Sequence, residues 1–172
     1  MKTATSLVLV TVLCAAASGF GAQAEIDKLT PSNLSAFLKT FTSDADQVND
    51  AFESMSKTKL PMFDAKGQTL GRRRIKDRQQ TVVDLKKTLQ DFKSRPENLV
   101  VAMTLSAQTE ELADEIYDLT ELAYDNDQEE TAMRLTRLLG HFNDDASLIQ
   151  AYALGLASQK EQRLSQLEKN TH

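Results

Sequence analysis

Apolar residues recur at intervals of three and four positions along most of the chain, with charged residues between them. This spacing places the apolar side chains on one face of an α-helix. Thr30 suits the N-cap of the first helix, Pro31 suits its first turn, and acidic residues such as Asp44 lie mostly off the apolar face. The pattern predicts a helix over residues 30–57 whose apolar face consists of Leu34, Phe37, Leu38, Phe41, Ala45, Val48, Phe52 and Met55.

Two further patterns of the same kind predict helices over residues 70–94 and 95–125. Ser94 and Glu97 have the spacing of a capping box, so we expect the later helix to begin there. The apolar face of the first of these helices consists of Ile75, Val82, Leu85, Leu89 and Phe92. That of the second consists of Leu99, Met103, Leu105, Leu112, Ile116, Leu119 and Ala123.

The fourth pattern begins after a run of acidic residues, which favour the N-terminus of a helix. Gly140 and residues 143–145 interrupt it, so it fits either one helix bent near residues 140–144 or two helices joined near Asn143. We predict a single helix over residues 127–168. Its apolar face consists of Leu135, Leu138, Phe142, Ile149, Tyr152, Leu156, Leu164 and Leu167.

Four amphipathic helices with short connections predict an all-α fold, an antiparallel four-helix bundle. The one long connection covers residues 58–71, and residues 64–67 have the composition of a type I turn. We predict an ordered loop that folds back over one end of the bundle. A small hairpin between residues 62–63 and 68–69 is the alternative, and a lid or partner-binding surface is another.

The first residues have the pattern of a secretory signal peptide. Lys2 precedes an apolar run over residues 7–17, and residues 22–24 form a small-x-small cleavage site. We expect cleavage after Ala24, which leaves residues 25–172 as a single helical-bundle domain that is periplasmic or extracellular. Cleavage removes Cys14, the one cysteine, so disulfides and thiolate chemistry are excluded. No membrane-spanning run remains.

Charge changes sign between the second and third predicted helices. Residues 57–95 include twelve basic and four acidic residues, whereas residues 97–130 include eleven acidic and no basic ones. If these helices fold back on each other at residues 94–96, Arg72 lies beside Asp118. We interpret the segregation as pairing within the bundle that selects neighbouring helices. The overall net charge of −5 argues against binding to nucleic acid.

The chain offers little catalytic chemistry. It has no Gly-x-Ser-x-Gly motif, no glycine-rich phosphate loop, and only His141 and the terminal His172 as histidines. The oxygen-bearing residues 125–130 lack the glycine and the bidentate glutamate of a calcium loop. We therefore predict that the protein is not an enzyme and holds no metal or cofactor.

His141 supports one alternative, a metal or a non-covalent haem bound with the help of Met55, Met103 or Met133. A lone histidine beside Gly140 is more often a surface or helix-bend residue, and we prefer that interpretation. Residues 41–48 and 142–149 also share a Phe-x-x-Asp-Ala-x-x-aliphatic pattern. We attribute this to chance agreement between amphipathic helices rather than to duplication.

These observations lead to a hypothesis of an exported, non-catalytic helical bundle that acts as a binding or protein-interaction module. The expected partner is a protein or an anionic ligand, and self-association as a homo-oligomer stays open. The predicted site combines the apolar residues of the long connection with the basic cluster that follows it: Leu60, Met62, Phe63, Arg72, Arg73 and Arg74.

Overall fold

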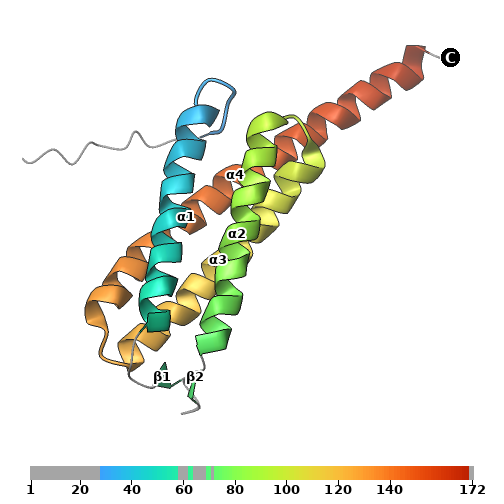
Figure 1. The fold of residues 1–172 in the computed structure, drawn as a ribbon. Coiled ribbons are helices and arrows are strands. Elements are labelled where there is room, and N and C mark those ends of the chain that lie inside the picture. Colours follow the sequence, from blue (N-terminus) through green and yellow to red (C-terminus); the bar gives the residue numbers. More distant parts are fainter. Residues whose placement is uncertain (1–27, 58–61, 64–68, 71, 171–172) are drawn as a thin grey trace, which may run out of the picture.

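The computed structural model describes residues 28–57, 62–63, 69–70 and 72–170. Within them, the helices are α1 (Leu34–Lys57), α2 (Arg72–Ser94), α3 (Leu99–Asp125) and α4 (Glu129–Asn170). Successive helices run in opposite directions and pack side by side (Figure 1). The predicted antiparallel four-helix bundle is therefore confirmed. The predicted leader, residues 1–24, lies outside the described residues.

The apolar faces of the four helices form one core. The predicted faces of α1 and α2 are buried throughout. The prediction is wrong for three residues of the later helices, because Met103 is 58% exposed, Leu164 61% and Leu167 63%. In α3 the buried face runs through Ala102 and Leu105, so Met103 points outward between them. The two leucines of α4 lie beyond the end of the bundle.

The start of α1 uses the predicted residues in a different way. The carbonyl of Thr30 accepts hydrogen bonds from the backbone nitrogens of Asn33 and Leu34. The side chain of Asn33 returns the bond, since its Oδ1 accepts from the backbone nitrogen of Thr30 at 2.8 Å. This reciprocal pair satisfies backbone groups that the first turn leaves without helical partners. The regular helix then begins at Leu34.

The turn between α2 and α3 differs from the predicted capping box. Ser94 is the last residue of α2, and its hydroxyl donates to the carbonyl of Gln90. The cap of α3 is Asn98, whose Oδ1 accepts from the backbone nitrogens of Val100 at 3.0 Å and Val101 at 3.4 Å. Helix α3 consequently begins at Leu99 rather than at residue 95.

This longer turn changes the register between α2 and α3. Arg78 donates from Nη2 to Oδ2 of Asp118 at 3.0 Å. The predicted neighbour of Asp118 was Arg72, which lies about 9 Å from Arg78 along the axis of α2. The predicted register is therefore wrong, although a basic residue of α2 does pair with an acidic residue of α3.

The connection between α1 and α2 contains a small hairpin, the alternative to the predicted loop. Strands β1 (Met62–Phe63) and β2 (Thr69–Leu70) pair antiparallel, with Met62 opposite Leu70 and Phe63 opposite Thr69. The second strand lies one residue later than residues 68–69. The turn residues 64–67 lie outside the described residues.

Helix α4 is one continuous helix of 42 residues that passes through Gly140 and Asn143. The prediction of a single helix is confirmed. Helix α3 has 27 residues. Because α4 is longer than α3, its C-terminal part projects from the bundle at the end opposite the hairpin (Figure 1). None of the helices described is both long and apolar enough to cross a membrane.

Candidate functional site

The predicted site lies at the end of the bundle where α1 ends and α2 begins. Met62 and Phe63 form β1, which packs near α3, and the three arginines at 72–74 open α2. The side chains of these residues, and the whole of Leu60, lie outside the described part of the chain. The grouping of apolar and basic residues at this end therefore stays a prediction.

Sequence reasoning missed a polar cluster between α1 and α4. Asp44 is only 6% exposed, and its Oδ2 lies 3.0 Å from Nδ1 of His141. The other oxygen, Oδ1, accepts from Nε2 of Gln47 at 3.1 Å. Arg134 of α4 in turn donates to the carbonyl of Gln47 at 3.3 Å. The nearly buried carboxylate of Asp44 thus has one hydrogen-bond partner on each helix, Gln47 on α1 and His141 on α4.

Asp145 also belongs to this cluster, and one of its carboxylate oxygens has no hydrogen-bond partner among the described residues. That oxygen, Oδ2, is buried. Burial, reinforced by the nearby charges of Asp44 and Asp144, raises the pKa of Asp145 from 3.8 to about 7, while His141 opposes the rise. Desolvation disfavours the charged carboxylate because the core solvates it poorly.

The shared Phe-x-x-Asp-Ala pattern was the signal that could have revealed this cluster. The rings of Phe41 and Phe142, the first residues of the two copies, meet edge to face with centroids 5.2 Å apart. Asp44 and Asp145, the fourth residues, interact electrostatically. The prediction that Asp44 lies off the apolar face is wrong, because the position three residues after Phe41 turns toward α4.

A second polar cluster joins α2 to α3. The hydroxyl of Thr81 donates to Oε1 of Glu115 at 3.1 Å. Arg78 bridges two further acceptors on α3, the carbonyl of Glu115 at 3.4 Å and the carboxylate of Asp118. Burial raises the pKa of Glu115, and Thr81 and Arg78 act in the opposite direction. This cluster ties together the basic and acidic helices.

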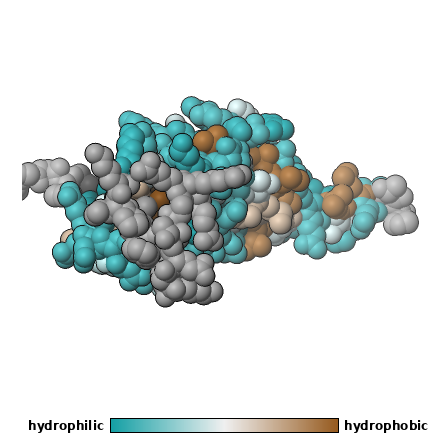
Figure 2. Space-filling model, turned by 60° about the horizontal axis from the view of Figure 1, so that its bottom comes forward, coloured by the Kyte–Doolittle hydropathy of each residue, from teal (hydrophilic) through white to brown (hydrophobic). Residues whose placement is uncertain are grey.

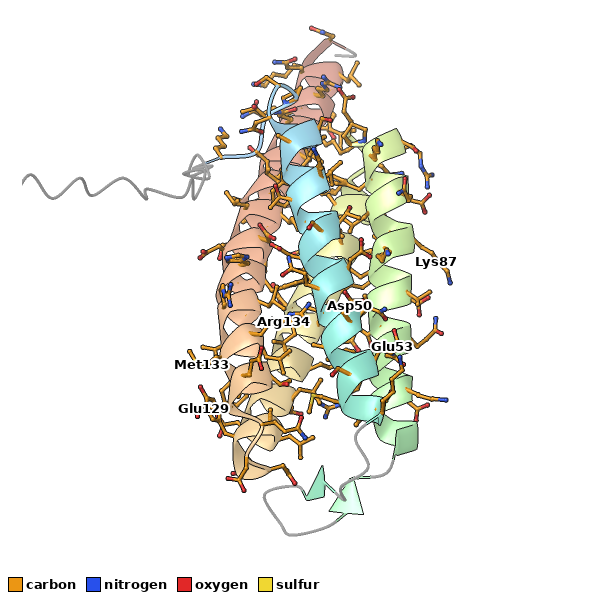
Figure 3. The ribbon with its side chains drawn as sticks, turned by 60° about the vertical axis from the view of Figure 1, so that its left-hand side comes forward. Asp50, Glu53, Lys87, Glu129, Met133 and Arg134 are labelled. Atoms are coloured by element: carbon orange, nitrogen blue, oxygen red, sulfur yellow. The ribbon has the colours of Figure 1, made fainter. Side chains whose placement is uncertain are left out.

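His141 has a geometry relevant to the haem or metal alternative. Asp44 occupies Nδ1, which leaves Nε2 as the nitrogen for any ligand, and the side chain is 43% exposed. Of the proposed methionines, Met55 is buried and Met133 is 60% exposed, on the outer side of α4 (Figure 3). Met133 lies about 12 Å from His141 along the helix, too far to share an iron. The described residues contain no group of three potential metal ligands.

A shallow groove of about 440 Å³ lies at the base of the projecting part of α4. It is lined by Leu29 and Leu34 before and in α1, by Pro96 in the α2–α3 turn, and by Tyr152 and Leu156 of α4. Members of the two polar clusters are absent from its lining. The lining is mostly apolar but also includes Lys28, Glu97 and Gln159.

The C-terminal extension of α4, residues 158–170, is exposed at every position. Leu164 and Leu167 are large apolar residues on it. Figure 2 shows the corresponding hydrophobic surface at the projecting end of the molecule. The extension is otherwise polar, so these two leucines are its exposed apolar residues, and the sequence pattern predicts them in the interior.

Comparison with known proteins finds no similarity from which a function could be transferred. No protein-family model matches the chain, and no curated protein or solved structure matches it. The functional argument therefore depends on the residues themselves.

Proposed function

We propose that the protein is an exported, non-catalytic helical bundle that acts as a protein-interaction module through the C-terminal extension of α4. The observation that carries this proposal is the apolar stripe of α4, which leaves the core after Leu156 and continues to Leu164, 61% exposed. A helix that presents apolar residues at helical spacing is suited to pack against a partner helix. Export is inferred from the leader pattern of residues 1–24.

The distribution of polar groups supports a non-catalytic role. The buried carboxylates of both clusters lie between packed helices, and they do not line the groove at the base of the extension. A catalytic acid or base must reach its substrate within hydrogen-bonding distance. Asp145 and Glu115 are better explained as polar groups that two packing helices share.

The test is site-specific photo-crosslinking in the native host. A photoreactive residue replaces Lys160, which lies on the same side of α4 as Leu156 and Leu164. The matched control carries it at Lys87, an exposed lysine on α2 that points away from the bundle (Figure 3). We expect a crosslinked protein from position 160 that is absent from position 87 and is lost with Leu164→Gln. Equal crosslinking from both positions would overturn the proposal.

The hairpin end is a second candidate surface, for an anionic partner. Its support is the run of three arginines that opens α2, where cations are unfavourable beside a helix N-terminus and would gain from an anionic neighbour. Replacing Arg72, Arg73 and Arg74 by glutamine tests it. An intact fold with an unchanged set of proteins in a pull-down from the native host would remove this surface from consideration.

A second candidate function is the binding of a metal or haem at His141. The observation in its favour is the contact of Nδ1 with Asp44, because metal-bound histidines commonly use their other nitrogen in this way. An absorption spectrum and a metal analysis of protein purified from its native host test it. A colourless, metal-free preparation would exclude this function.

A further inference from the structure

The extension of α4 continues the phase of the buried face. The positions that face the core near the end of the bundle are Ile149, Ala153 and Leu156. Steps of three and four residues lead from them to Lys160, Leu164 and Leu167. The same side of α4 that packs against the bundle is therefore presented to solvent over residues 158–170.

A helical segment as short as residues 158–170 is only weakly stabilised when it is exposed to water. Isolated helices shorter than about 12–15 residues are marginal in water, and their stability in proteins comes from packing an amphipathic face. All thirteen residues from 158 to 170 are exposed. A partner that covers the apolar side would stabilise the extension.

We propose that this partner is a second copy of the chain, packed antiparallel along the extension with Leu164 of the two copies in contact. The inference rests on the proposed function and names its partner. Residue 164 is the midpoint of residues 158–170, so this register overlaps the two extensions completely. The two bundles then lie at opposite ends of the paired extensions.

The charges of the extension fit this register. When Leu164 meets Leu164 of the second copy, Lys160 lies at the level of Glu168 of that copy, and Glu168 lies at the level of its Lys160. The twofold axis thus produces two identical opposite-charge pairs from one sequence. The long stem of Lys160 also covers apolar surface while its ammonium group reaches Glu168. A parallel pair would place Lys160 beside Lys160.

The overlap is short, so the dimer is weak. An interface of this length falls below the roughly 1,200 Å² of total buried surface that stable complexes bury, and micromolar or weaker association is typical of such contacts. Analytical ultracentrifugation of the exported chain over a wide concentration range is the suitable measurement. We expect a reversible monomer–dimer equilibrium.

Charge reversal tests the register directly. Lys160→Glu alone and Glu168→Lys alone each place like charges opposite one another, and we expect each to weaken dimerisation about tenfold. A mixture of the two variants pairs opposite charges at both positions and should restore the dimer as a heterodimer. Leu164→Gln should give a monomer, whereas Leu154→Gln, at an exposed position of α4 before the extension, should leave the equilibrium unchanged.

The outcomes separate this inference from the proposed function. A chain that stays monomeric, but crosslinks to another protein from position 160, overturns the dimer and leaves the interaction module standing. A monomeric chain with no specific crosslink overturns both. A dimer that persists in Leu164→Gln, or variants that fail to recover on mixing, overturns the antiparallel register.

Discussion

The bundle contains two polar clusters between neighbouring helices, and they satisfy a buried carboxylate in different ways. Glu115, between α2 and α3, has the hydroxyl of Thr81 on one oxygen and the permanently charged Arg78 nearby. Asp145, between α1 and α4, has the imidazole of His141 nearby, and that imidazole already contacts Asp44. Each acid keeps one buried oxygen without a hydrogen-bond partner among the described residues.

The difference follows from the distribution of charge along the chain. Helix α2 is rich in basic residues and α3 in acidic ones, so an acid that becomes buried between them meets a cation. Asp44 and Asp145 come from helices that both contribute acids to their shared face. The α1–α4 contact is therefore the one whose stability should respond more strongly to protonation.

We expect Asp145→Asn to change the free energy of unfolding more than any other substitution proposed for the two clusters. Because folding raises the pKa of Asp145 from 3.8 to about 7, the folded chain binds this proton more tightly than the unfolded chain. Its contribution to stability is therefore most favourable below about pH 4, falls as the pH rises to about 7, and is flat above. The pKa difference corresponds to at most about 4 kcal/mol.

The amide cannot ionise, so Asp145→Asn should raise the free energy of unfolding at about pH 8 and leave it unchanged at about pH 4. Urea unfolding at both pH values measures this. Glu115→Gln is the matched control, and we expect it to show the smaller gain. An unchanged pH dependence in Asp145→Asn would show that this carboxyl is well solvated.

His141→Gln should have the next largest effect. It removes the imidazole from the nearly buried Asp44, and loss of one partner of a buried polar group costs about 1–3 kcal/mol. The same substitution should raise the pKa of Asp145 further, because His141 lowers it. Carbon-13 NMR titration of the Asp145 carboxyl measures the shift. A fall in that pKa would contradict the assigned role.

Arg78→Gln probes the other cluster. It removes the cation that donates hydrogen bonds to Asp118 and to the carbonyl of Glu115. The free energy of unfolding should fall by about 1–2 kcal/mol. The loss is no larger because Asp118 is exposed, so water screens much of the ion pair. The pKa of Glu115 should rise. NMR titration of Glu115 and chemical unfolding are the measurements, and an unaltered pKa of Glu115 would mean that Arg78 only joins the helices.

We expect Thr81→Val to cause the smallest change in the free energy of unfolding. The substitution keeps the side-chain shape and removes one hydrogen bond to Glu115, worth about 1 kcal/mol. The pKa of Glu115 should rise more than in Arg78→Gln, because the hydrogen bond from Thr81 lowers it more than the charge of Arg78 does. NMR titration of Glu115 and thermal unfolding are the measurements, and a smaller rise in this pKa than in Arg78→Gln would contradict the expected order.

The fold was predictable because helical periodicity is a repeated signal. Phe41, Leu89, Ile116 and Leu138 all fall where their spacing places them, in the core. Short local signals were less reliable, since Ser94 and Glu97 resembled a capping box while Asn98 supplied the cap. A four-residue difference in where α3 begins was enough to change which residue faces Asp118.

The polar cluster of α1 and α4 was not predictable from either helix alone. Asp44 and His141 are 97 positions apart in sequence, and their contact depends on how two helices are aligned. The exposure of Leu164 has a similar cause, because periodicity shows which face is apolar but not where the neighbouring helix stops.

The length of α4 determines how long a dimer joined through its C-terminal extensions would be. A helix of 42 residues extends for about 63 Å, and it starts at the same end of the bundle as the hairpin (Figure 1). Two copies joined tip to tip over thirteen residues would form a rod roughly 105 Å long. In that dimer the two hairpin ends would point away from each other, at the far ends of the rod.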